Sequence, residues 1–177
     1  MYEKTFPNKR FAHTMEFIEK HIAKEESILD LGVPNPLSEI MSKNGYTVHN
    51  TVGEDLDTDF SLINTFEGDV VTAFEIFEHL LAPLNVLSEI KATKLVTSIP
   101  LRLWFSPAYR SKTDPWDRHY HEFEDWQFDW LLEKAGWEIK DRLKWNHPVK
   151  KIGVRPFLRL FTPRYYIVYA ERKDVKN

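Results

Sequence analysis

Four side chains have types and spacings that suit proton-transfer chemistry. Glu75 lies in an apolar run, where a carboxyl group is hard to explain by packing alone, and His79 follows it closely. His119 and His121 form an HxH pair farther along the chain. Histidine titrates nearest to neutral pH, so His79, His119 and His121 could each act as a general base in catalysis. The alternatives are that His79 only caps or orients a helix start, and that the HxH segment is a plain polar loop.

The HxH pair also has a spacing that suits zinc. In an extended segment, residues two positions apart point to the same face, so the rings of His119 and His121 would lie on one side. The sequence offers no clear third ligand, and we therefore name no metal site. The chain contains no cysteine, which excludes disulfides, thiolate metal ligands and a cysteine nucleophile.

Hydrophobic periodicity predicts the elements that must position these side chains. Six short apolar runs are typical of strands: 27–32, 46–52, 69–74, 94–99, 137–143 and 164–171. Four segments have helical spacing or helix-end signals: about 9–24, 36–44, about 78–92 and 124–135. In the second of these helices, Asn35 suits the N-cap and Pro36 the first helical position. Strands that alternate with helices predict an α/β domain with a mainly parallel sheet.

Length and composition fit one soluble domain. The 177 residues are 42% hydrophobic and 29% charged, which is enough to build a core and unlike a disordered chain. No apolar run approaches the roughly 20 residues that cross a bilayer, and the N-terminus lacks the apolar core of a signal peptide. We expect a cytoplasmic protein with one domain over 1–177, in which a helix over 1–24 precedes two halves, 27–100 and 101–177.

The net charge of −3 is unevenly distributed along the chain. The segment 139–164, called the basic stretch below, contains eight lysines and arginines and one aspartate. Its charge of +7 leaves −10 for the rest of the chain, so it should form a local positive surface on an acidic body. Such a surface attracts anions.

Four segments occur in the order and spacing of one large enzyme family. Their ranges are 28–32 (ILDLG), 69–80 (DVVTAFEIFEHL), 95–100 (LVTSIP) and 121–139. Together they resemble the class I S-adenosylmethionine-dependent methyltransferases of the type 11 and type 12 kind. The resemblance implies a Rossmann-like three-layer sandwich, with a mainly parallel sheet and an antiparallel C-terminal strand, and S-adenosylmethionine as the cofactor. It also makes 27–100 the cofactor-side half and 101–177 the acceptor-side half.

The resemblance further implies which residues contact the cofactor. They are Asp30, Gly32, Val33, Asn35, Glu54, Asp55, Phe74 and Glu75. Glu54 and Asp55 would hold the ribose hydroxyls, because the acid that does so lies about 20 residues beyond the glycine turn. A solvated acidic turn is the alternative for this pair. Phe74 would face the sulfonium through a cation–π contact, or else pack in the core.

Two features depart from the family's pattern. Pro34 and Pro36 stand where the family has further glycines, so two cofactor contacts are missing, because proline fixes φ and donates no N–H. Asn35 tolerates a left-handed φ, and the helix N-terminus after it could still hold a ligand carboxylate. Only sixteen residues, 53–68, separate the second and third predicted strands. The family's third strand and its crossover helix are therefore truncated or lost, or 61–66 forms a vestigial strand.

The resemblance implies a methyltransferase that acts on a small molecule. The basic stretch favours an anionic acceptor, or a lipid-linked sugar, that enters between 102–121 and the basic stretch. Aromatic residues nearby would permit shallow contact with a membrane surface, and a nucleic-acid acceptor is less favoured. A second hypothesis is a catalytically silent binding protein, in which Pro34 and Pro36 mark the loss of cofactor binding. A dinucleotide-dependent oxidoreductase is disfavoured because no GxGxxG fingerprint follows the first strand, and the oligomeric state stays open.

Overall fold

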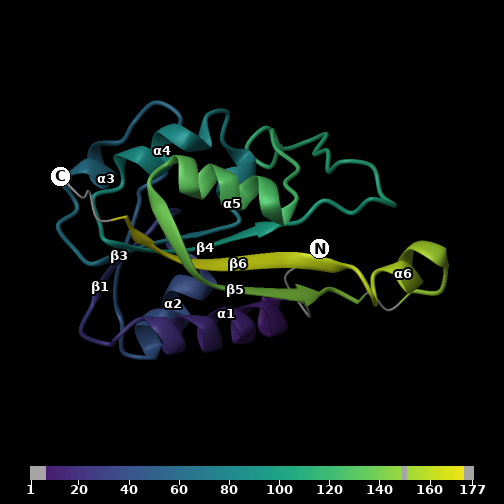
Figure 1. Cartoon of the computed structure of the whole chain (residues 1–177), viewed down its shortest axis with the longest axis horizontal. Coiled ribbons are helices and arrows are strands. Elements are labelled where there is room, and N and C mark those ends of the chain that lie inside the picture. The colour runs from purple at the N-terminus through teal and green to yellow at the C-terminus, as the bar shows by residue number, and fades with distance from the viewer. Residues whose placement is uncertain (1–6, 149–150, 174–177) are drawn as a thin grey trace.

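A six-stranded mixed sheet runs through the centre of the molecule (Figure 1). The computed structural model describes residues 7–148 and 151–173. The strands are β1 (Ser27–Asp30), β2 (Thr47–Asn50), β3 (Val70–Phe74), β4 (Lys94–Pro100), β5 (Trp137–Asn146) and β6 (Pro163–Arg172). In the order β2-β1-β3-β4-β6-β5 the first four strands are parallel, and β6 is antiparallel to both β4 and β5. The predicted α/β sheet with an antiparallel C-terminal strand is therefore confirmed.

Helices cover both faces of the sheet, which gives the predicted three layers (Figure 1). They are α1 (Pro7–His21), α2 (Pro36–Lys43), α3 (Ser61–Thr65), the 3₁₀ helix η1 (Phe77–His79), α4 (Pro83–Glu89), α5 (Asp125–Lys134) and α6 (Val154–Leu158). Alternate residues of β3 serve the two faces: Val70 belongs to the apolar cluster under α1 and α2, and Val71 to the larger cluster under α4 and α5. Within the part of the chain that the structure describes, no helix is long and apolar enough to cross a membrane.

The segment between β2 and β3 lacks the family's third strand. Residues 51–69, all of them described, form loops and the short helix α3 but no strand. The predicted loss of the strand is confirmed, and the alternative of a vestigial strand over 61–66 is wrong. The Asp59 carboxylate accepts hydrogen bonds from the N–H and hydroxyl of Ser61, which favours a turn and a helix start there. As a result β2 is an edge strand, and none of its residues is fully buried.

The predicted helix over 78–92 is wrong in its first part. The chain forms a single 3₁₀ turn, η1, and then an extended step before α4 begins at Pro83. Proline fits the first helical position, but its ring would clash inside a continuous helix. The N–H groups of Leu81 and Ala82 are instead bound by the carboxylate of Asp57, at 2.9 Å each. The end of β3 therefore leads into an irregular segment that can present side chains to a site.

The hairpin of β5 and β6 extends beyond the sheet and ends in α6, a helix that the sequence analysis did not predict (Figure 1). A bulge between Ile139 and Asp141 shifts its register. Asp141 contacts α1, where Oδ2 lies 2.7 Å from Lys20 Nζ and 2.8 Å from His21 Nε2. These hydrogen bonds, that of Lys20 above all, lower the pKa of Asp141 to about 2. The contact joins α1 to the hairpin.

Replacing Asp141 by asparagine should lower the free energy of unfolding by about 0.5–1 kcal/mol at neutral pH, since the ion pair is partly exposed. Because the pKa of Asp141 is lower in the folded than in the unfolded chain, this stability is present above about pH 4 and is lost as the pH falls toward about 2. Urea unfolding at about pH 7, 4 and 2.5 should show the difference between the parent and D141N shrink toward zero. A difference of constant size over this range would contradict the assignment.

Candidate active site

Glu75, the residue after β3, has a left-handed backbone. Its φ is 58°, and within 7–148 and 151–173 it is the one non-glycine residue with a positive φ. This conformation costs a residue with a side chain about 1–2 kcal/mol, and such residues concentrate at functional sites. The turn is fixed to β4, because the Glu75 N–H donates to the Ser98 carbonyl at 2.9 Å and the Ser98 hydroxyl donates to Glu75 Oε1 at 3.1 Å. Glu75 thus lies where the two central strands end.

An arginine from α1 lies beside the mostly buried Glu75. Glu75 Oε2 is 3.5 Å from a guanidinium nitrogen of Arg10, and the glutamate side chain is 18% exposed. Burial raises the pKa of Glu75, and Arg10 and the Ser98 hydrogen bond partly oppose this. The sequence analysis did not find Arg10, because an amphipathic helical pattern does not show which polar side chain will meet a strand end.

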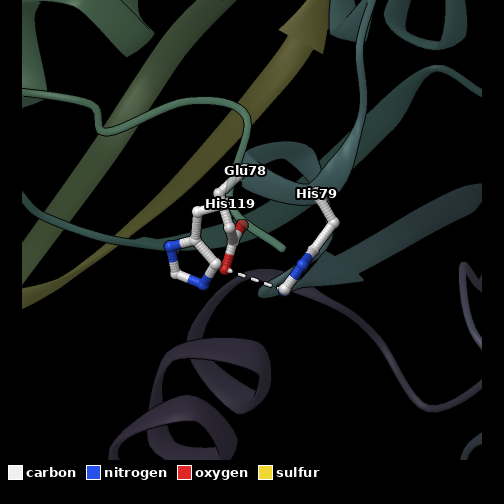
Figure 2. Close-up of side chains that lie close together, drawn as sticks. All are labelled: Glu78, His79 and His119. Atoms are coloured by element: carbon white, nitrogen blue, oxygen red, sulfur yellow. Dashed lines mark ion pairs between the residues drawn. The ribbon is translucent and has the colours of Figure 1, made fainter. Parts of the chain in front are cut away.

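Glu78, His79 and His119 bring their side chains to one point (Figure 2). The Glu78 side chain is 1% exposed, and its Oε1 lies 3.8 Å from His79 Nε2. Its Oε2 has no hydrogen-bond partner among the described residues. Burial first, and then the nearby Glu75, raise the pKa of Glu78 well above its usual range. The two rings meet edge to face with 4.7 Å between their centroids, and burial, followed by His79, lowers the pKa of His119.

His121 lies apart from His119, so the expectation that the HxH rings share one face is wrong. The N–H groups of Tyr120 and His121 both donate to the Glu78 carbonyl, at 2.8 and 3.2 Å, and the chain bends at Tyr120. The bend breaks the alternation that an extended segment would have. His121 Nε2 instead lies 3.3 Å from the Leu81 carbonyl oxygen, and the His121 ring stacks on the ring of Phe123.

A cavity of about 180 Å³ adjoins Glu75 and joins the two segments that were expected to border the acceptor. Its lining comes from the end of β3, from the loop after β4 and from the basic stretch: Glu75, Pro100, Tyr109, His119, His147, Arg159, Arg164 and Tyr165. Arg164 is held in place by donating to the Leu101 carbonyl at 2.5 Å. Burial, and then Arg159 and Arg164, lower the pKa of His147. Lys150 of the basic stretch lies outside the described residues.

Asp30, the last residue of β1, fixes the turn between β1 and α2, which is called the first turn below. Asp30 is 2% exposed, and its carboxylate accepts hydrogen bonds from Thr72 Oγ1 at 2.7 Å and from Asn35 and Asn50 Nδ2 at 3.1 Å each. Burial raises the pKa of Asp30 and the three hydrogen bonds oppose the shift. The side chain of this predicted cofactor residue is therefore fully used in joining the ends of β1, β2 and β3.

The first turn has the predicted helix start but not the predicted use of Asn35. Asn35 is the N-cap of α2 and Pro36 its first residue, as predicted. Asn35 is extended, with φ −141°, so the left-handed position falls to Gly32, whose N–H donates to Thr51 Oγ1 at 2.7 Å. Asn35 Oδ1 accepts from the first free N–H groups of α2, so these are not open to a ligand carboxylate as was expected. Val33 is exposed and lies beside Gly53 in the turn after β2, which is called the second turn below.

The acidic turn after β2 contains one buried carboxylate oxygen without a hydrogen-bond donor among the described residues. Glu54 Oε2 accepts from the Val52 N–H at 2.8 Å, while its Oε1 is buried and has no partner within the described chain. Asp55 is exposed and accepts from the N–H of Asp57. At the end of β2 itself stands Asn50, turned inward to Asp30. A buried carboxylate oxygen without a donor is costly, and a ligand hydroxyl would pair with it only after the Glu54 side chain rotates outward, whereas Asp55 is already exposed.

The remaining predicted residue, Phe74, packs against the apolar cluster under α1 and α2. Several polar residues of the site were missed by sequence reasoning: Arg10, Ser98, Tyr109 and His147. The predicted candidates Glu75 and His119 and the charge of the basic stretch, through Arg159 and Arg164, were the signals that pointed to this region.

The strain at Glu75 predicts an unusual mutational response. Glu75→Gly should leave the free energy of unfolding unchanged or raise it by up to about 1 kcal/mol, because glycine relieves the left-handed strain and removes a buried carboxyl group. The matched change Glu138→Gly, on β5 where φ is not positive, should lower it by about 0.5–1 kcal/mol. Urea unfolding of the two variants checks this. If E75G lost more stability than E138G, the contacts of Glu75 would outweigh its strain.

The sequence matches no protein-family model and no curated relative. Solved structures do match the fold. A candidate S-adenosylmethionine-dependent methyltransferase from Listeria monocytogenes is 11% identical over 93% of this chain and 99% of its own, with a TM-score of 0.59. The N-terminal domain of EvdMO1, solved with S-adenosylhomocysteine bound, is 14% identical over 92% of this chain and 80% of its own, at 0.55. The cyclase SpnF is 13% identical over 98% and 85%, at 0.58.

These similarities concern the fold, and the cyclase among them shows that one fold serves more than one reaction. The chain has the fold of the class I S-adenosylmethionine-dependent methyltransferases.

Proposed function

We propose that the protein is an S-adenosylmethionine-dependent methyltransferase that acts on a small anionic acceptor. The observation that carries the proposal is the place of Glu75 at the end of β3: the strands to one side, β1 and β2, lead into the turns that contain Gly32 and Glu54, and Glu75 itself lines a cavity with two arginines. In open α/β sheets, ligands bind outside the carboxyl ends of the strands, which is where these groups meet.

The cofactor would lie over the first and second turns. Gly32 has a φ of 146°, a backbone conformation that residues with a Cβ rarely adopt, so glycine suits this turn beside the proposed cofactor. Glu54 would turn its buried, unpaired Oε1 toward the cofactor and accept hydrogen bonds from the ribose hydroxyls. When bound, S-adenosylmethionine supplies an electrophilic methyl group on its sulfonium.

The acceptor would occupy the cavity beside Glu75. Arg159 and Arg164 can form charge-assisted hydrogen bonds with a phosphate or carboxylate, and Tyr109 and Tyr165 offer ring faces to a sugar. Methyl transfer is an in-line displacement, so the main task of the protein is to align the two substrates. A base removes the acceptor's proton, and Glu75, His119 and His147 all line the cavity. His121 lines another pocket, with Leu81 and Trp130, and His79 lies behind His119.

The tip of the hairpin supports a lipid-linked acceptor as a variant of this proposal. Large apolar side chains are exposed on and around α6: Ile152, Val154, Phe157, Leu160 and Phe161. Lys151 and Arg155 are exposed beside them. Apolar side chains flanked by cations are typical of segments that contact anionic membrane surfaces.

The rival proposal is a catalytically silent binding protein. It is supported by the two prolines of the first turn, by the capped N-terminus of α2 and by Asn50 at the end of β2, where an acid would serve ribose. The two proposals differ in whether cofactor binding survives.

Titration with S-adenosylhomocysteine, followed by calorimetry, separates the two. The parent should bind, and Glu54→Gln should weaken binding about 10- to 100-fold, because a hydrogen bond to a charged acceptor is worth about 1.5–3 kcal/mol. The control Asp55→Asn, at the exposed neighbour, should leave the affinity unchanged. Absence of binding to the parent at millimolar concentration would favour the silent protein, and Pro34→Gly with Pro36→Gly would then test whether the prolines are responsible.

Arg159 tests the nature of the acceptor. Arg159→Gln should weaken the binding of a hexose phosphate about tenfold or more and leave the weak binding of the same hexose without phosphate unchanged. Arg155→Gln is the control and should change neither affinity, because Arg155 lies in α6, of which Arg159 is the C-cap, but outside the cavity lining. Equal effects of R159Q on both probes would argue against an anionic acceptor.

A further inference from the structure

We propose that Glu78, His79 and His119 bind a divalent transition-metal ion beside the cavity. The site is argued from three side chains, whereas the role given to the ion below rests on the proposed function. Each residue contributes one ligand atom, and these atoms lie within 4.8 Å of one another (Figure 2). Around a tetrahedral ion with bonds of about 2.0–2.1 Å, ligand atoms are about 3.3 Å apart. Binding therefore requires any two of the ligand atoms to approach each other by about 1.5 Å at most, and rotation of an imidazole ring provides a movement of this size.

The second nitrogen of each histidine has a partner that leaves Nε2 for the ion. His79 Nδ1 lies 3.0 Å from the Arg118 carbonyl oxygen, so Nδ1 carries the proton and Nε2 carries a lone pair directed toward Glu78. His119 Nδ1 lies 3.5 Å from Glu122 Oε1. Carbonyl and carboxylate oxygens are the usual partners of the non-ligating nitrogen at metal-binding histidines.

Glu78 supplies the unsatisfied charge that a cation would neutralise. Its carboxylate is almost fully buried, and Oε2 lacks a hydrogen-bond donor among the described residues. A buried carboxylate oxygen without a donor is costly, and His79 Nε2, which lies 3.8 Å from Oε1, is beyond hydrogen-bond range. Glu75 adds further negative charge nearby. A bound cation would remove the cost of burying the Glu78 carboxylate. His79 does not remove it, because its Nε2 is 3.8 Å away.

The donor set points to a transition metal rather than magnesium. Two imidazole nitrogens and one carboxylate oxygen are the ligands of catalytic zinc and related ions, and such sites keep positions open for substrate. Magnesium prefers oxygen ligands at octahedral geometry. The polypeptide loop that holds His119 is tied to the ion site by the Tyr120 and His121 N–H groups on the Glu78 carbonyl.

An ion at this position would prepare an acceptor hydroxyl for methyl transfer. His119 lines the cavity, so an open position of the ion would face it. Coordination lowers the pKa of a hydroxyl, and its proton would pass to Glu75 or His147. The hydroxyl oxygen then forms the bond to the methyl carbon while the carbon–sulfur bond breaks and its electron pair stays on sulfur. His119 acts here as a ligand and not as the base.

Titration of the chelator-treated protein with Co²⁺ tests the site, because the visible absorption of bound Co²⁺ reports its coordination. We expect saturable binding of a single ion, displacement by Zn²⁺ and no displacement by excess Mg²⁺. Glu78→Gln and His119→Gln should each weaken Co²⁺ binding at least about tenfold. His121→Gln is the matched control, since His121 lies outside the cluster, and its affinity should equal that of the parent.

Circular dichroism without metal shows whether E78Q and H119Q fold, and Glu122→Gln provides a milder variant that should weaken binding by a smaller factor. Failure of the parent to bind Co²⁺ or Zn²⁺, or equal affinity in the parent, E78Q and H119Q, would overturn the proposal. Preference for Mg²⁺ would overturn the assignment to a transition metal. Titration with S-adenosylhomocysteine is independent of these readouts: cofactor binding without metal binding refutes the ion site alone, and metal binding without cofactor binding refutes the methyltransferase alone.

Discussion

The carboxylate of Asp30 is the contact on which the arrangement of the strand ends depends. It is buried at the end of β1 and binds Thr72 on β3, Asn50 on β2 and Asn35 in the first turn. Each donor would be costly to leave unpaired beside a buried charge, so the four groups keep one another in place. The edge of the sheet at which the site lies is therefore rigid before any ligand arrives.

Some polar groups at the strand ends bind one another, and others keep a buried oxygen without a hydrogen-bond donor in the described part of the chain. Asp30, Asn35 and Asn50 bind one another, whereas Glu54 and Glu78 each retain an oxygen without a donor. Buried acids and a strained backbone reduce stability, and they persist only where the surrounding packing holds them. Here the two apolar clusters on the faces of the sheet provide that packing.

The loss of a strand is compensated locally. Where the family's third strand would follow, the chain makes the turn that contains Asp57, whose carboxylate binds the N–H groups of Leu81 and Ala82. These two hydrogen bonds hold the segment after β3 in place, and this segment contains η1 with Glu78 and His79.

The sequence by itself determined the order of the strands and of α1, α2, α4 and α5, and the start of α2 at Pro36, through apolar periodicity and the N-cap Asn35. The antiparallel C-terminal strand and the missing third strand followed from the family resemblance, the latter together with the short interval between β2 and β3. The sequence also indicated Glu75 and the basic stretch, because a carboxyl group in an apolar run and a cluster of like charges are visible without a structure.

Only the tertiary structure decided which side chains meet. Arg10 reaches Glu75 from α1, and His147 and Arg164 reach the same cavity from the hairpin, through contacts between segments far apart in the chain. The N–H groups of Tyr120 and His121 both donate to the Glu78 carbonyl oxygen, and the chain bends there. As a result His119 lies beside Glu78 and His79, and His121 lies apart from it. Such contacts depend on long-range hydrogen bonds and on which segments pack together, and residue spacing along the chain carries no information about either.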